Sequence, residues 1–166
     1  MNKKIVWGLI VLAIILIFGY FYNQKNEEFK LITDETEMTE FVMTHSQEEL
    51  DEYYRKVDEL KASDIYGGKT PEETLQLYIE ALKTGDMELA SKYFRLEDQE
   101  KELFLYENTD VEEMDNFVEI LDNSGAVLCN ESIESCELRG ESNGQNVWMA
   151  DFIKIEQSGL WKLKSL

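Results

Sequence analysis

Hydrophobic and polar positions follow a helical period over most of the chain, and the pattern first becomes clear at Ser46. Ser46 and Glu49 have the spacing of a capping box, in which each side chain accepts from the other residue's backbone N–H. Behind this box, apolar residues recur every three or four positions on one stripe: Leu50, Tyr53, Tyr54, Val57 and Leu60. Gly67 and Gly68 then favour a flexible corner. We therefore expect a lead-in helix within residues 46–69.

Residues 70–94 predict two short helices joined by a sharp corner. Thr70 is of a type preferred at an N-cap, and Pro71 suits the first helical position, where no N–H is needed. Gly85 predicts a left-handed stop, and Asp86 predicts an immediate second N-cap. The buried stripe of the first helix is expected to consist of Leu75, Tyr78, Ile79 and Leu82. The cap position accounts fully for the carboxylate of Asp86.

Beyond these helices, the period of the pattern changes from 3.6 to 2 near Gly125, which predicts a sheet. Before the change, Asp110 and Glu113 predict the start of one more helix. Its apolar positions are Met114, Phe117, Val118 and Leu121. Helices followed by antiparallel strands predict an α+β fold.

The first predicted hairpin contains both cysteines. If Cys129 lies opposite Cys136, then Val127 faces Leu138, and all four side chains fall on one side of the sheet. This register permits a disulfide in an oxidising compartment. Two buried free thiols are the alternative, since cysteine often behaves as a small apolar residue.

The second predicted hairpin turns at Ser158 and Gly159. With simple alternation, one face of its first strand carries Val147, Met149, Asp151, Ile153 and Ile155. The other face carries Trp148, Ala150, Phe152 and Lys154. Asp151 is unusual because it interrupts an apolar face, where a carboxylate would be desolvated.

The N-terminal residues 5–22 contain no charged side chain. As a helix they would span about 27 Å, close to the ~30 Å hydrocarbon core of a bilayer. Trp7 near one end, with Tyr20 and Tyr22 near the other, match aromatic residues at the two headgroup levels. A cleaved signal peptide is the alternative, but no small residues follow the run. Two lysines precede it, so we expect residues 1–22 to be a transmembrane signal-anchor with the rest of the chain outside the cytoplasm.

Residues 23–45 predict either a solvated stalk or a short helix. Asp34 and Glu37 have capping spacing, and Met38, Phe41 and Val42 would share one face. The sequence leaves both possibilities open. His45, the one histidine of the chain, is expected to be a surface residue.

The charge of the chain excludes one class of partner. From residue 23 onward there are 14 basic against 35 acidic residues, a formal charge of −21. Such a surface repels phosphate backbones, so we expect no nucleic-acid binding. With one histidine and no acidic residues at metal-ligand spacing, we also expect no metal and no cofactor.

Residues 70–166 resemble a known superfamily. The opening "TPEETLQLYIEALKTGDMELASKYF" and the closing strand "GLWKL" are similar to the nuclear transport factor 2-like (cystatin-like) superfamily, in particular to small membrane-anchored bacterial domains of unknown function. The resemblance implies a bent sheet that wraps a long helix and leaves a conical cavity. Enzymes of the superfamily place an Asp/His or Asp/Tyr set inside the cone, and this chain has no histidine in the matching region.

Two classes of function follow. The first is an extracytoplasmic, membrane-tethered binding or assembly domain of the cell envelope without intrinsic catalysis, which takes a protein or a small apolar ligand. Its candidate anchors are Tyr53, Tyr54, Trp148 and Trp161.

The alternative is a cone-type isomerase or hydrolase. It would use Asp151 as base and Tyr78 as proton donor. The simpler interpretation of Asp151 is a place at the open end of a strand, or an ion pair with Arg139 or Lys162. A core packed solid with apolar side chains would argue against the enzyme.

Overall fold

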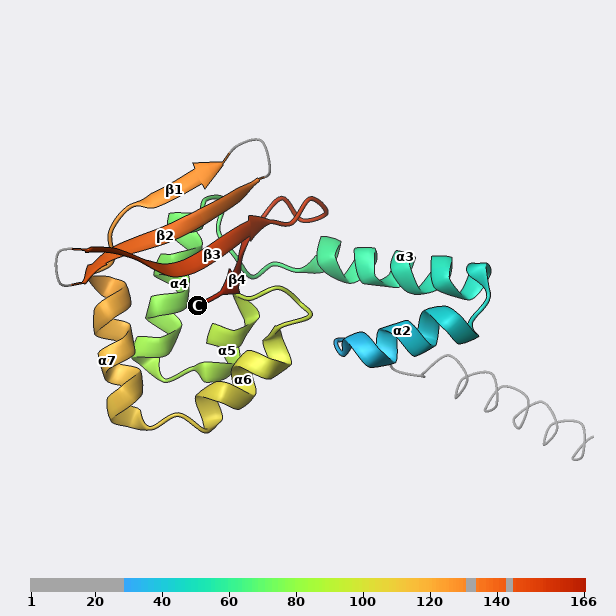
Figure 1. Ribbon diagram of the computed structural model, residues 1–166, viewed down its shortest axis with the longest axis horizontal. Helices are drawn as coiled ribbons and strands as arrows, with labels where there is room; N and C mark the ends of the chain where they lie inside the picture. Colours follow the sequence, from blue (N-terminus) through green and yellow to red (C-terminus); the bar gives the residue numbers. More distant parts are fainter. Residues whose placement is uncertain (1–28, 131–133, 143–144) are drawn as a thin grey trace, which may run out of the picture. The chain divides into compact units, whose positions relative to one another are not determined.

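The computed structural model describes residues 29–130, 134–142 and 145–166. The chain divides into two compact units, Met1–Leu31 and Ile32–Leu166. The second unit contains every described helix and strand (Figure 1). The expected anchor at residues 1–22 lies outside the described residues.

Two helices precede the rest of the second unit. Helix α2 spans Glu35–Thr44, and the side chain of Asp34 caps it by accepting from the backbone N–H groups of Thr36 and Glu37. Helix α3 spans Gln47–Ser63, and the capping box expected at its start is present. Of the two possibilities left open for residues 23–45, the helix is therefore correct over the length of α2.

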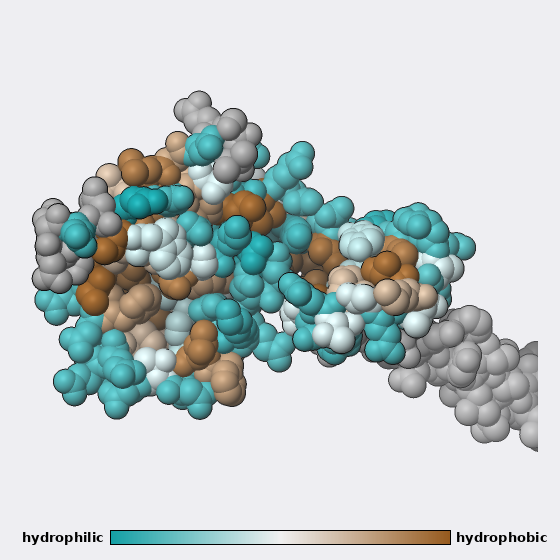
Figure 2. Space-filling model, in the orientation of Figure 1, coloured by the Kyte–Doolittle hydropathy of each residue, from teal (hydrophilic) through white to brown (hydrophobic). Residues whose placement is uncertain are grey.

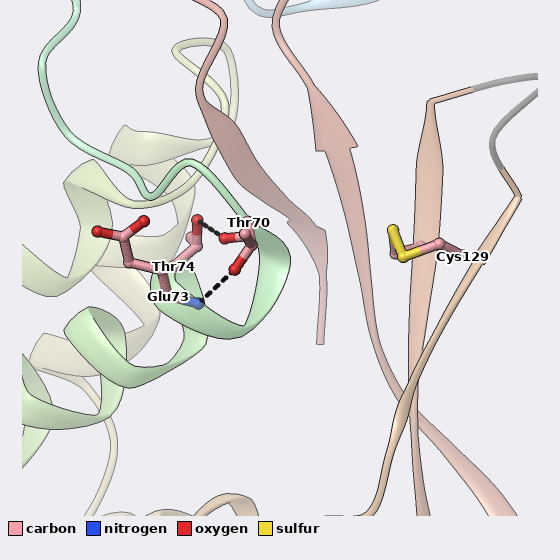
Figure 3. Close-up of a disulfide and its surroundings, with 5 residues drawn as sticks. Thr70, Glu73, Thr74 and Cys129 are labelled. Carbon is pink, nitrogen blue, oxygen red and sulfur yellow. Dashed lines mark hydrogen bonds between the residues drawn. A yellow bond between two sulfur atoms is a disulfide. The ribbon is translucent and has the colours of Figure 1, made fainter.

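The pair of helices expected in residues 70–94 is confirmed. Helix α4 spans Pro71–Thr84, and Thr70 Oγ1 accepts from the backbone N of Glu73 at 3.2 Å (Figure 3). Gly85 ends α4 with φ of 73°, in the left-handed region. Helix α5, Met87–Lys92, starts at once, with Asp86 as its N-cap.

Two further helices and four strands complete the fold. The helices are α6, Gln99–Glu107, and α7, Val111–Asp122. The strands are β1, Val127–Asn130; β2, Ser135–Ser142; β3, Gln145–Lys154; and β4, Trp161–Ser165. They form one antiparallel sheet in the order β1-β2-β3-β4.

The register expected for the first hairpin is confirmed. Cys129 pairs with Cys136, and Val127 pairs with Leu138. The inner face of the sheet, which packs on the helices, carries side chains at most 1% exposed: Cys136, Leu138, Ala150, Phe152 and Leu163. The alternation of β2 thus directs Cys136 and Leu138 to the core.

Strand β3 departs from the expected simple alternation. Its partner changes from Leu138↔Ala150 to Arg139↔Trp148, so Met149 is an extra residue in a β-bulge. The bulge moves Trp148 to the outer face of the sheet, the face that Asp151 occupies. The prediction that these two side chains point to opposite faces is therefore wrong.

The core between helices and sheet is filled with large side chains. The largest apolar ones are less than 2% exposed: Tyr78, Phe94, Leu121, Leu138, Phe152 and Leu163. Three of them come from strands of the sheet. The others come from α4, α7 and the segment after α5, which lie on the inner side of the sheet (Figure 1). These side chains belong to one apolar core cluster.

The expected fold class, a transmembrane helix followed by a nuclear transport factor 2-like cone, is therefore corrected. The described residues form an α+β fold of six helices and a four-stranded antiparallel sheet. None of these six helices is both long enough and apolar enough to cross a membrane. The longest, α3, has 17 residues, and more than half of them are charged.

Candidate functional site

Tyr78, the expected proton donor of the enzyme alternative, lies wholly inside the core on α4. Its hydroxyl is 2.8 Å from the hydroxyl of Tyr106 on α6, and its ring meets Phe94 edge to face. Burial raises the pKa of both phenols. The two hydroxyls therefore stay protonated at physiological pH and satisfy each other.

This pair predicts a coupled effect on stability. Tyr78→Phe should lower the free energy of unfolding by about 1–2 kcal/mol, because the hydroxyl of Tyr106 then stays buried without a partner. Tyr106→Phe should do the same, and the double variant should lose less than the sum of the two. Urea unfolding followed by circular dichroism measures these differences. Tyr93→Phe is the control, since the hydroxyl of Tyr93 makes no hydrogen bond within the described part of the chain. Equal and additive losses would contradict the coupling.

Asp151, the candidate base, lies on the outer face of the sheet. Its carboxylate accepts from Trp148 Nε1 at 2.8 Å and from Ser165 Oγ at 3.1 Å. Since Tyr78 lies on the inner side, the sheet separates the two groups. Among the described residues, no hydrogen bond joins them, so the base and donor of the enzyme alternative are not brought together.

The ion pairs that the sequence suggested for Asp151 are formed by other carboxylates. Arg139 pairs with Glu137, two positions away on the same face of β2. Lys162 is 1% exposed, and its ammonium lies 2.6 Å from Asp64. The expectation of a pairing between Asp151 and Arg139 or Lys162 is wrong, because nearer carboxylates take both cations.

Two of the four aromatic binding candidates have structural roles. Tyr53 is 7% exposed, packs on Phe41 of α2 with ring centroids 5.0 Å apart, and accepts from the backbone N of Ile32. Trp161 packs against the core. Its backbone N–H donates to the carbonyl of Gly68, and its carbonyl accepts from the hydroxyl of Thr74.

The other two aromatic candidates are exposed, on different surfaces. Tyr54 is 49% exposed on α3, where it borders a shallow hollow that also includes Gln157. Trp148 is 44% exposed on β3 and borders a larger groove beside α7. The structure thus does not gather the four aromatic residues into one site.

The groove beside α7, called the α7 groove below, has a volume of about 790 Å³. Its apolar lining consists of Phe117, Ile120, Leu121, Val147, Trp148, Met149 and Leu166. Its polar lining consists of Asn116, Glu119, Asn123 and Ser124, together with the backbone at Gly140. In Figure 2, hydrophobic residues are exposed next to the hydrophilic surface of α7.

Most residues of this groove were not predicted from the sequence. Ile120 is 58% exposed and lies off the buried stripe of α7, which contains Met114, Val118 and Leu121. An isoleucine outside the stripe of an amphipathic helix was the available signal. The contribution of Val147 and Met149 depends on the β-bulge, which the pattern of the strand does not reveal.

Among the described residues, the α7 groove is lined by one carboxylate, Glu119, and by no lysine or arginine. Within the described residues, no group of three or more His, Cys, Asp or Glu side chains could hold a metal ion. His45 is exposed at the end of α2, where its Nδ1 lies 3.0 Å from the backbone oxygen of Phe41.

Of the two possibilities for the cysteines, the structure has the disulfide. Cys129 and Cys136 join β1 to β2, with their Cα atoms 4.0 Å apart (Figure 3). Cys136 is buried in the core, while Cys129 is exposed on the edge strand. The bond fastens a strand of four residues to the sheet.

No protein-family model, curated protein or solved structure matches the chain at a significant level. The resemblance of residues 70–166 to the nuclear transport factor 2-like superfamily stays a prediction.

Proposed function

We propose that the second unit is a non-catalytic binding domain that takes apolar side chains of a partner, or a small apolar ligand, in the α7 groove. The observation that carries this proposal is the exposed apolar lining of the groove. Ile120, Trp148 and Val147 are 58%, 44% and 37% exposed, and all three line the same hollow. A volume of about 790 Å³ falls within the range of typical ligand pockets, about 300–1,000 Å³.

A position outside the cytoplasm is part of the proposal. The Cys129–Cys136 disulfide supports it, because disulfides persist in oxidising compartments and are rare in the cytosol. The charge-free run at residues 5–22 supports attachment to a membrane, and that attachment remains a prediction from the sequence.

The enzyme alternative has less support. Its base, Asp151, is engaged by Trp148 and Ser165 on the outer face of the sheet. Its donor, Tyr78, is buried on the inner side. The sheet lies between the two groups, and no hydrogen bond among the described residues joins them.

Dye binding tests the proposal. The full chain is placed in nanodiscs of zwitterionic lipid and titrated with Nile red, a neutral apolar dye, and the signal of empty discs is subtracted. Ile120→Gln should weaken dye binding about tenfold, because it removes an apolar contact of roughly 1–2 kcal/mol.

The matched control is Val111→Gln. Val111 belongs to the same helix and is 77% exposed, but it does not line the groove. Its replacement should change the dissociation constant less than twofold. Equal binding by wild type and Ile120→Gln would mean that the dye does not occupy the groove, and the proposed site would be rejected.

A further inference from the structure

We infer that the occupant of the α7 groove is a cationic, amphipathic polypeptide segment of another protein. This inference rests on the proposed function and adds the charge and the chemical class of the partner. It follows from the distribution of charge on α7 and around the groove.

Every charged residue of helix α7 is acidic. It carries no lysine or arginine, and its five acidic residues are Glu112, Glu113, Asp115, Glu119 and Asp122. Asp122 is neutralised by Lys83 at 2.8 Å. The other four are exposed, and within the described part of the chain none of them forms an ion pair. One of these four unpaired carboxylates, Glu119, lines the apolar groove, and the other three belong to the same helix.

The charge next to the groove selects against anionic ligands. Glu119 lines the groove next to Ile120, and no lysine or arginine of the described residues lines it. A fatty acid or other anionic amphiphile would bring its charge toward Glu119 without a counter-ion. A lysine or arginine beside an apolar side chain would instead meet the carboxylate of Glu119 while the apolar side chain enters the groove.

The polar lining favours a polypeptide over a hydrocarbon. Asn116 and Ser124 border the apolar floor and offer hydrogen-bond donors and acceptors to a peptide backbone. A second copy of this chain is a poor occupant, because each copy carries a formal charge of −19 and the two would repel each other. The same overall charge would steer a cationic partner toward the protein.

Fluorescence anisotropy with synthetic peptides tests the inference. Three short labelled peptides share the same leucine and phenylalanine positions and carry lysine, serine or glutamate at the others. The full chain in zwitterionic nanodiscs should bind the lysine peptide at least tenfold more tightly than the other two. The affinity should fall as the salt concentration rises, since added salt screens exposed charges.

Paired variants separate local recognition from general attraction. Asp115→Asn together with Glu119→Gln removes two unpaired charges of α7, one of which lines the groove, and lysine-peptide binding should weaken about fivefold. Glu40→Gln together with Glu48→Gln removes two charges from α2 and α3 and should change binding less than twofold.

The outcomes distinguish the two proposals. If the three peptides bind equally well, or if the α2–α3 variant weakens binding as much as the α7 variant, the cationic partner is rejected. Loss of Nile red binding in Ile120→Gln would still support the apolar site in that case. If Ile120→Gln changes neither dye nor lysine-peptide binding, both the site and the inference fall.

Discussion

Asp64→Asn should lower the free energy of unfolding by about 3–5 kcal/mol, the largest effect expected for a single charge in this protein. The side chain of Lys162 is 1% exposed, and its ammonium lies 2.6 Å from Asp64 and 2.7 Å from the backbone oxygen of Lys92. The side chain of Asp64 is 5% exposed. The substitution therefore leaves a buried positive charge without its carboxylate.

Urea unfolding measures this loss as a shift of the midpoint, provided that wild type and variant show the same dependence of the unfolding free energy on urea concentration. The control is Asp122→Asn, which breaks the exposed pair between Lys83 and Asp122 and should cost less than about 1 kcal/mol. Adding Lys162→Met to Asp64→Asn should recover much of the stability, since the double variant contains no buried charge. The interpretation fails if Asp64→Asn costs no more than Asp122→Asn.

The pH dependence should distinguish wild type from Asp64→Asn. Burial lowers the pKa of Lys162 below 10.5, and the carboxylate of Asp64 opposes this shift. A lysine with a lowered pKa binds fewer protons in the folded state, so stability rises with pH between the folded pKa and about 10.5. Without Asp64 the pKa falls further, and the stability of the variant should rise with pH over a wider range.

Gly67→Ala should be the most damaging glycine substitution in the described part of the chain, with a loss of at least about 2 kcal/mol. Gly67 has a φ of +137°, which L-residues rarely adopt. An added Cβ would also lie 2.5 Å from the backbone oxygen of Trp161. This oxygen accepts from the buried hydroxyl of Thr74 at 2.9 Å, so the clash would disturb the junction of α4 with β4.

Gly159→Ala separates backbone strain from the clash. Gly159 also has a positive φ, +70°, but no atom lies within 4 Å of a Cβ added there. Gly159→Ala should lower the free energy of unfolding by about 1 kcal/mol, the usual penalty for an L-residue in the left-handed region. Urea unfolding compares the two variants, and equal losses would show that the contact with Trp161 adds nothing.

Helix boundaries were predictable from the sequence because capping is local. The side chain of Thr70 accepts from the backbone N–H of Glu73, and that of Asp86 accepts from the backbone N–H of Leu89. Gly85 adopts the left-handed conformation directly after α4. Each interaction joins residues within a few positions, so it forms whatever lies elsewhere in the chain. The register of Cys129 and Cys136 was predictable for a similar reason, since they lie only seven positions apart in one hairpin.

The candidate site and the charge partners depended on the tertiary structure. The β-bulge at Met149 places Trp148 on the outer face of the sheet. The alternation of residues in β3 does not predict this bulge. Lys162 and Asp64 lie almost a hundred positions apart in the sequence. They meet because β4 packs beside the segment after α3, which encloses both side chains. The α7 groove likewise combines Ile120 with Val147 and Met149 from another element. Long-range packing decides which side chains meet, and a local period records only which face of its own element each side chain occupies.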